Sequence, residues 1–232
     1  LRVTAAALAG VAPRDAPVHR QLAAAWGIRR RADADLLRRA LVLCADHELN
    51  PSTFAVRCIA STGTHLFGAI AGGLAALSGP RHGGETLRAG ALLDEAAHAA
   101  DLDRYLAQRL ARDERSEGAR TALAGFAHPL YPDGDPRARA LLDALCTTQP
   151  ERQPLRAAGA LAARVEAATG LRPTIDFALA VLERTLALPA GAGFTLFAAG
   201  RTAGWIAHAI EQYADGKLIR PRARYVGSDA PG

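Results

Sequence analysis

Seven polar or charged side chains interrupt segments that are otherwise apolar, and their types suit acid–base chemistry on an acidic substrate. They are His47 in ADHELN, His82 in GPRHGG, His128 in GFAHPLY, Asp176 in PTIDF, Arg137 in DPRA, Arg201 in GRTAGWIAH and Arg220 in IRPRARYVG. Histidine and aspartate can move protons, and arginine binds a carboxylate through two parallel hydrogen bonds. Each residue alone has an ordinary structural explanation, but the seven together favour acid–base chemistry on a polycarboxylate.

His82 lies at the junction between two predicted helical segments. Gly79-Pro80 ends the Ala- and Gly-rich segment before it, and a helix is predicted over 86–98 after it. The positive end of that helix disfavours a charged imidazole, so we expect His82 to be neutral and able to donate a hydrogen bond. The glycines that follow it would let a ligand approach the backbone closely.

The composition and the hydrophobic pattern predict an all-α chain. Half of the residues are hydrophobic but only 5% are aromatic, alanine dominates, and no strand-like alternation persists. Two short helices are predicted within 1–32, and the later ones over 34–44, from 51 onward, 86–98, 102–111, 136–146, 155–169, 175–186 and 195–214, before an extended basic tail over 218–227. Asp33, Ser52, Asp135 and Thr174 are expected to cap the helices that follow them.

The 232 residues carry a formal charge of +5, and Lys217 is the single lysine among 28 basic residues. An arginine-based positive charge fits acidic small molecules as well as nucleic acid. The cysteines Cys44, Cys58 and Cys146 have spacings typical of neither a disulfide framework nor a metal site, which favours a reducing, cytoplasmic setting. We expect no membrane span and no signal peptide. The absence of methionine predicts that the chain is the later part of a longer protein.

Longer segments around the seven residues resemble the citrate synthase family. The similar segments are ADHELNPSTFAVRCIAST, GGLAALSGPRHGG, GFAHPLYPDGDPRA, RPTIDFALAVL and FAAGRTAGWIAHAIEQYADGKLIRPRARYVG; they occur in the family's order and cover nearly all of residues 40–227. The resemblance implies an all-α, two-domain homodimer that lacks roughly the N-terminal third of a typical member. A large helical domain would comprise 1–82 and 183–232, the latter with an extended C-terminal tail, and a small helical domain would comprise 83–182.

The resemblance also implies condensation of acetyl-CoA with oxaloacetate to give citrate and CoA, with acetyl-CoA as co-substrate and with neither a further cofactor nor a metal. Asp176 would remove a proton from the acetyl methyl, and His82 would donate to the thioester oxygen as the enol forms. His128 would give a proton to the oxaloacetate carbonyl. The oxaloacetate carboxylates would be held by four further residues, of which the last reaches in from the partner subunit: His47, Arg137, Arg201 and Arg220.

Three departures from the family pattern concern the acyl-CoA side. Glu85-Thr86 follows the two glycines where members usually have Ala and then Asn. Pro129 and Leu130 replace a basic and a branched residue, and Pro132 stands where a cation near the CoA phosphates is common. We therefore expect acyl-CoA to bind more weakly than in a typical member.

Two alternatives to citrate formation stay open. A 2-methylcitrate synthase would use propionyl-CoA with the same motifs. A non-catalytic relative would sense a dicarboxylate, and the absent N-terminal part would then be a DNA-binding domain. Direct nucleic-acid binding by the tail over 217–224 is disfavoured, because few aromatic residues alternate with its arginines.

Overall fold

The computed structural model describes residues 1–80, 82–113, 123–224 and 227, and within these ranges the chain forms helices and no β-sheet. The helices are α1 (Arg2–Leu8), α2 (Val18–Ala25), α3 (Arg31–Leu43), α4 (Pro51–Ala60), α5 (Leu66–Leu77), α6 (Gly84–His98), α7 (Leu102–Asp113), α8 (Pro136–Thr148), α9 (Gln153–Thr169), α10 (Ile175–Thr185) and α11 (Ala192–Asp215). The predicted all-α fold is confirmed. Arg81, the charged stretch from 114 to 118, and residues 225–226 of the predicted tail lie outside the described residues.

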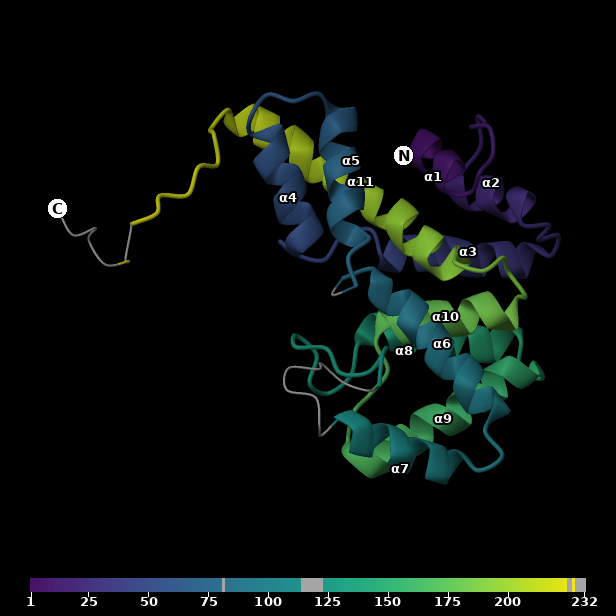
Figure 1. The fold of residues 1–232 in the computed structure, drawn as a ribbon. Coiled ribbons are helices and arrows are strands. Elements are labelled where there is room, and N and C mark those ends of the chain that lie inside the picture. Colours follow the sequence, from purple (N-terminus) through teal and green to yellow (C-terminus); the bar gives the residue numbers. More distant parts are fainter. Residues whose placement is uncertain (81, 114–122, 225–226, 228–232) are drawn as a thin grey trace.

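The longest helix, α11, is the element on which most of the others pack (Figure 1). It contacts α1, α3, α4, α5, α6 and α10. Gly191 and Gly216 bound it with positive φ values of 84° and 67°, a conformation that glycine adopts without strain. Leu196, Phe197 and Trp205 on this helix are buried in the core. Because α11 contacts α1, α3, α4 and α5 as well as α6 and α10, it joins the first five helices to the group α6 to α10.

Two glycines of α11 bring the end of α3 against its backbone. A Cβ atom at Gly200 would lie 2.6 Å from the Leu41 carbonyl oxygen, and one at Gly204 would lie 2.4 Å from the Ala45 carbonyl oxygen. The Gly204 N–H also donates to the Ala45 oxygen at 3.0 Å. A larger residue at either glycine would push the backbones apart, so this contact fixes the segment 44–50 beside α11.

The glycine-rich segment 54–77 forms parts of two helices that pack closely, α4 and α5. A Cβ atom at Gly72 would lie 2.1 Å from Ile59 Cδ1, and one at Gly73 would lie 2.6 Å from Val56 Cγ2. Side chains of α4 thus occupy the space that these glycines of α5 leave open.

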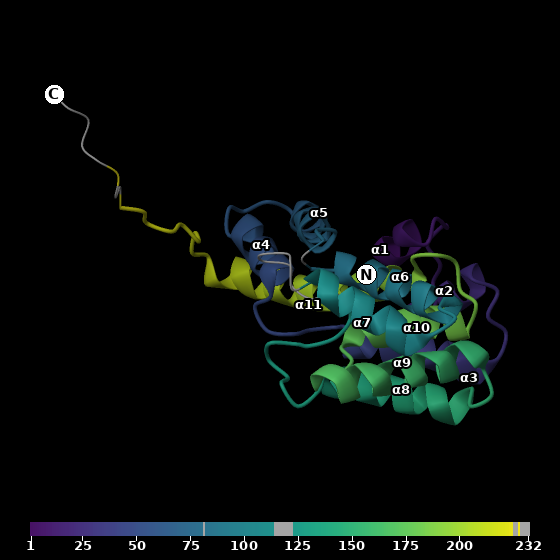
Figure 2. The ribbon, with the colours of Figure 1, turned by 60° about the horizontal axis from the view of Figure 1, so that its bottom comes forward.

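Helix α10 lies in the middle of the second group, which comprises α6 to α10 (Figures 1 and 2). It contacts α6, α8, α9 and α11, and every residue from Phe177 to Leu182 is buried. A helix that is apolar on all sides is held by its surroundings on all sides. The first turn of α10, which carries Asp176, is therefore fixed in place.

The predicted caps are only partly correct. Asp135 caps α8 as predicted, because its side chain accepts the Arg137 N–H. Asp33 does not cap α3: that helix begins at Arg31, two residues earlier. The Asp33 carboxylate instead accepts a buried hydrogen bond of 2.6 Å from Gln149 Nε2, which joins α3 to the end of α8.

Two further caps were predicted wrongly because a neighbouring side chain does the capping. Asn50 is the N-cap of α4 and accepts the Thr53 N–H, which leaves the Ser52 hydroxyl for other partners. Thr174 stands at the N-cap of α10, but its side chain makes no capping bond. The Ile175 N–H donates to Asp135 Oδ2 at 3.0 Å instead.

None of the described helices is long and apolar enough to cross a bilayer. In Figure 1, α6 to α10 lie below α3, α4, α5 and α11. The division into a large and a small domain stays a prediction, and its boundary at 182 would fall within α10. The tail after Gly216 has no helix or strand among its described residues and extends away from the body of the molecule.

Candidate active site

Six of the seven predicted side chains line one cavity of about 300 Å³. They come from six different places in the fold: the loop before α4, the turn before α6, the loop before α8, the first turns of α8 and α10, and the third turn of α11. The six are His47, His82, His128, Arg137, Asp176 and Arg201. Apolar walls complete the cavity, with Leu49, Pro129, Leu130, Ile175 and Phe197 among them.

Arg201 is the most deeply buried cation of this group, with 1% of its surface exposed. Its Nε donates to the Cys44 carbonyl oxygen at 2.9 Å, and its guanidinium lies 5.2 Å from the centre of the Phe197 ring. Its buried Nη2 has no hydrogen-bond partner among the described residues. An unpaired buried guanidinium nitrogen is costly, so Arg201 is suited to receive a carboxylate that enters the cavity.

Arg137 is held along one edge by Asp135. Its Nε donates to Asp135 Oδ1 at 2.9 Å and its Nη2 donates to Oδ2 at 2.8 Å. Burial opposes ionisation of Asp135, but the paired guanidinium outweighs it and lowers the pKa of this carboxyl. Because Asp135 also accepts the Ile175 N–H, one carboxylate joins the start of α8 to the start of α10, and it thereby sets Arg137 near Asp176.

His82 is neutral, as predicted, but for another reason. Burial is the main cause that lowers its pKa to about 4, and the nearby Arg201 adds to it. The sequence assigned this effect to the helix dipole, whereas the structure assigns it to the surroundings of the ring.

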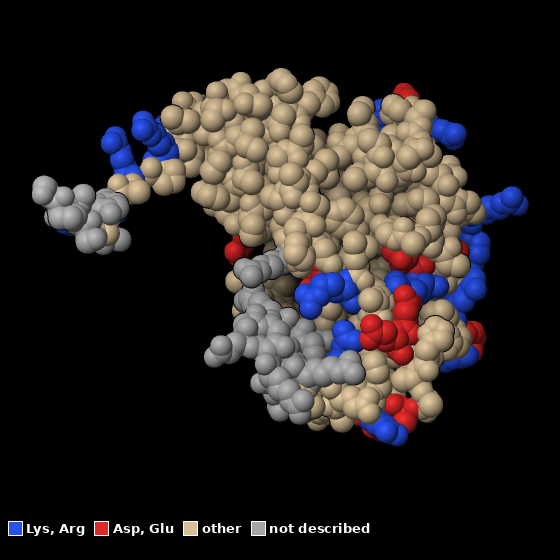
Figure 3. Space-filling view, in the orientation of Figure 1, with Lys and Arg blue, Asp and Glu red and all other residues tan. Residues whose placement is uncertain are grey.

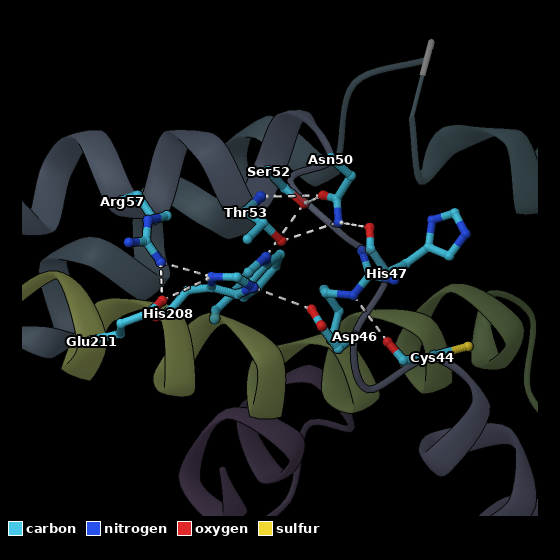
Figure 4. A network of polar contacts seen from close by, with 11 residues as sticks. Cys44, Asp46, His47, Asn50, Ser52, Thr53, Arg57, His208 and Glu211 are labelled. Carbon is cyan, nitrogen blue, oxygen red and sulfur yellow. Dashed lines mark hydrogen bonds and ion pairs between the residues drawn. The ribbon is translucent and has the colours of Figure 1, made fainter. Parts of the chain in front are cut away.

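The Ser52 hydroxyl connects His82 to a wider polar network, and Figure 4 shows the part of it around Ser52 and Asn50. Ser52 Oγ lies 2.8 Å from His82 Nε2 and 2.7 Å from Asn50 Oδ1, and it accepts from Trp205 Nε1. A hydroxyl has one proton to give. Given to Asn50 Oδ1, that proton leaves Ser52 Oγ to accept from His82 Nε2–H. Given to His82 Nε2 instead, it places the proton of the neutral ring on Nδ1, from which His82 can donate to a ligand.

His47 and His128 contact each other and Tyr131. The two imidazole centroids are 5.2 Å apart, and His47 Nε2 lies 2.9 Å from the Tyr131 hydroxyl. Burial, followed by Arg137 and then His128, lowers the pKa of His47 to about 4. The Leu130 N–H donates to His128 Nδ1 at 3.2 Å, so the neutral His128 ring carries its proton on Nε2.

Tyr131 is a residue of this site that the sequence analysis missed. Its ring also lies 4.9 Å from that of His128 and 5.4 Å from the Arg137 guanidinium. Its position three residues after His128, in a Pro- and Gly-rich stretch, could have indicated a turn that brings the two side chains together. The structure has this turn, because the Tyr131 N–H donates to the His128 carbonyl oxygen at 2.9 Å.

A non-glycine residue next to each of two histidines, His47 and His128, has a left-handed backbone conformation. Glu48, after His47, has φ of 51°, and Ala127, before His128, has φ of 63°. Non-glycine residues in this region cost about 1–3 kcal/mol each and persist where the surroundings impose them. The backbone conformation next to both histidines is therefore imposed by the surrounding structure rather than by local preference.

Asp176 has the properties of a base near neutrality. Its Oδ1 accepts a hydrogen bond of 2.5 Å from Thr86 Oγ1. Part of Asp176 stays accessible from the cavity, although dense protein surrounds it. Burial is the main cause that raises its pKa to about 6; the Thr86 bond opposes this rise and the charge of Glu85 adds to it.

Glu85 was expected to face the acyl-CoA, and the structure gives its carboxylate two local partners. Its Oε1 accepts the Gly125 N–H at 3.0 Å, and its Oε2 pairs with Arg88 at 3.0 Å. Pro132 is exposed and does not line the cavity. Weaker acyl-CoA binding stays a prediction.

A second group of polar residues, also missed by the sequence analysis, supports the segment that carries His47 (Figure 4). His208 on α11 accepts from Arg57 Nη1 through Nδ1 at 3.0 Å, so its neutral form carries the proton on Nε2. That Nε2 lies 3.4 Å from Asp46 Oδ1, and Glu211 completes the group through an ion pair with Arg57. These contacts tie the loop before α4 to both α4 and α11.

Arg220 is the one predicted side chain that does not line the cavity. It is exposed on the tail after α11, where the Ile219 N–H donates to Ser61 Oγ at 3.1 Å. Among the described residues, no three His, Cys, Asp or Glu side chains are grouped so that they could hold a metal ion.

A family model and curated relatives show the family of this chain. Residues 3–222 match the family described as "Citrate synthase, C-terminal domain". A "Putative citrate synthase 2" of Mycobacterium tuberculosis is 38% identical over 191 residues, which are 80% of this chain and 49% of that protein. A "Citrate/2-methylcitrate synthase" of Bacillus subtilis is 35% identical over 199 residues, 84% of this chain and 52% of that protein. The chain thus spans about half the length of these relatives.

A solved structure shows the same fold. Citrate synthase from the archaeon Thermoplasma acidophilum, in a ternary complex with carboxymethyl coenzyme A and oxaloacetate, superposes with a TM-score of 0.76 at 28% identity. The match covers 99% of this chain and 65% of that one.

Proposed function

The chain belongs to the citrate synthase family, and from this premise we propose that it condenses acetyl-CoA with oxaloacetate to give citrate and CoA. The observation that carries the proposal is the pairing, within one cavity, of a carboxylate base and a buried cation with an unpaired nitrogen. Asp176 has a pKa raised to about 6, chiefly by burial, and Arg201 Nη2 has no partner among the described residues. A base for a weakly acidic C–H group beside a receptor for a carboxylate is what this condensation needs.

In this proposal Asp176 takes a proton from the acetyl methyl, and the C–H electrons form the enol double bond. His82 donates a hydrogen bond to the thioester oxygen as negative charge develops there. The enol carbon then attacks the ketone carbon of oxaloacetate, whose oxygen takes a proton from His128 Nε2. Water finally cleaves the thioester and releases citrate and CoA.

Oxaloacetate is held by His47, Arg137 and Arg201 in this proposal. Arg137 is directed by Asp135 along one edge of its guanidinium, through Nε and Nη2, and Arg201 offers Nη2. His47 and His82 are neutral because their pKa is lowered to about 4, so the positive charge that meets a dianionic ligand is that of the two guanidiniums.

Thiol release tests the activity of the full chain. With oxaloacetate present, we expect acetyl-CoA to give thiol release that depends on both substrates, and citrate to form in equal amount. Propionyl-CoA is the comparison, because one relative is named for both citrate and 2-methylcitrate. A higher kcat/KM for propionyl-CoA would assign the second product, and oxaloacetate binding without thiol release from either thioester would contradict catalysis.

The protein acts as a homodimer in this proposal, with Arg220 of the partner subunit completing each oxaloacetate site. The face over α4 and α5 in Figure 3 carries almost no charged side chains, and Phe54 and Phe67 on these helices are 47% and 74% exposed. An uncharged apolar face of this kind suits a subunit interface. Arg220 itself lies on a tail that leaves the body of its own chain.

Mixing two inactive variants tests the shared site. Arg220→Ala and Asp176→Asn should each be nearly inactive alone. Coexpressed subunits that pair at random should recover about a quarter of normal activity, because each mixed dimer holds one site with both residues intact. Recovery of activity supports sharing, whereas sedimentation as a monomer at micromolar concentration, or no recovery in verified mixed dimers, would contradict it.

A further inference from the structure

Thr86 contacts the predicted catalytic base from a helix far away in the sequence. It lies in the first turn of α6 with 2% of its surface exposed, and its Oγ1 is 2.5 Å from Asp176 Oδ1 on α10. The carboxylate has no proton to give, so Thr86 is the donor. The bond joins the first turn of α6 to the first turn of α10.

The hydrogen bond makes the two oxygens of Asp176 unequal. A threonine hydroxyl has a single proton, and here that proton goes to Oδ1. No described residue donates a hydrogen bond to Oδ2, and Asp176 lines the cavity. Oδ2 is therefore the oxygen that is left for a substrate.

Packing fixes the direction of the Thr86 hydroxyl. A Cβ atom added at Gly193 of α11 would lie 3.1 Å from Thr86 Cγ2, so the methyl group rests against that glycine. Gly193 is itself held, because its N–H donates to Glu183 Oε2 at 2.8 Å. With the methyl group directed at α11, the hydroxyl is directed at α10.

Charged groups on α6, α8 and α11, and one residue before α8, act on Asp176 together with this bond. Glu85 on α6 and Asp135 before α8 disfavour the ionised carboxylate, while Arg137 on α8 favours it. Arg201 on α11 also interacts with Asp176 electrostatically. Within this balance, the Thr86 hydrogen bond favours the ionised form.

We propose that Thr86 is a positioning residue for the Asp176 base: its hydroxyl holds Oδ1 so that Oδ2 alone faces the acyl methyl. This inference rests on the proposed function, and it adds a residue to that function. A base that is held at one oxygen approaches the methyl proton in one orientation, and loss of such an orientation lowers the chemical rate rather than substrate binding.

A matched pair of variants separates the hydroxyl from the methyl group. Thr86→Val keeps the shape and loses the hydroxyl, whereas Thr86→Ser keeps the hydroxyl and loses the methyl group. We expect the valine variant to lower kcat by about tenfold or more while the KM for oxaloacetate stays within about twofold. The kcat of the serine variant should stay within about threefold of that of the unmodified protein. Equal losses in both variants, with lowered melting temperatures, would reduce Thr86 to a packing residue and overturn the proposal.

The pKa of Asp176 gives a readout that needs no activity. Carbon-13 NMR of labelled aspartate, without substrates, should show this pKa higher in Thr86→Val than in the unmodified protein, because a bond to the charged form is lost; Thr86→Ser should leave it in place. An unchanged pKa in the valine variant would contradict the role of Thr86. Absence of thiol release from the unmodified protein would instead contradict the proposed function, so the two failures are distinguishable.

Discussion

Replacing Asp176 by asparagine should lower the kcat of citrate formation by about 10²- to 10⁴-fold, the range for loss of a positioned base. Asparagine has nearly the same shape and can still accept the Thr86 hydrogen bond, so the fold and the cavity should persist. Oxaloacetate should bind as before by calorimetry, because Asp176 acts on the acetyl methyl. Exposed Asp133 provides the matched control, and Asp133→Asn should change neither quantity.

The pH profile gives an independent check of the same residue. Asp176 must be ionised to accept a proton, and burial raises its pKa to about 6. The rate of the unmodified protein should therefore fall as the pH drops through about 6, rather than through the range near 4 typical of exposed aspartates. The residual rate of the asparagine variant should lack this acidic limb. A variant that keeps more than a few per cent of the rate would show that another group removes the proton.

Replacing Arg201 by glutamine should raise the Kd for oxaloacetate by about 30-fold or more, the usual consequence of removing one partner of a buried charge pair. The buried Nη2 without a described partner is the reason, because it is the atom in the cavity that most needs a carboxylate. Calorimetry measures the Kd directly. Arg139→Gln, at an exposed position on α8, is the control.

Thermal unfolding distinguishes a binding role of Arg201 from a structural one. An unpaired buried charge destabilises a free protein, so Arg201→Gln should unfold at the same temperature as the unmodified protein or higher. The added stability that oxaloacetate gives the unmodified protein should be lost in the variant. A much lower melting temperature with normal oxaloacetate binding would contradict the assignment.

The sequence predicted the helices well because most of them have a clear apolar face. Its errors fall at helix starts, where several polar side chains compete for the same N–H groups. Asn50 rather than Ser52 caps α4, and Asp33 binds Gln149 across 116 positions instead of capping its own helix. Local preference identifies the candidate caps, but only the tertiary contacts decide between them.

The residues of the candidate site were proposed from motifs, and the fold brings six of them to one cavity. The contacts between them could not be read from the sequence. Thr86 and Asp176 are 90 positions apart, and the ring of Tyr131 meets His47 only because the loop before α8 folds over the loop before α4. The low pKa of His82 likewise depends on burial, which no local pattern reports.

The central place of α11 has a consequence for local unfolding. Its 24 residues contact six other helices, so its amides should exchange with solvent only when the whole domain opens, whereas α7, which packs chiefly on α9, can open at lower free energy. Arg201 stands on the helix that opens last. The cation proposed to receive oxaloacetate should therefore stay in place when a peripheral helix such as α7 opens.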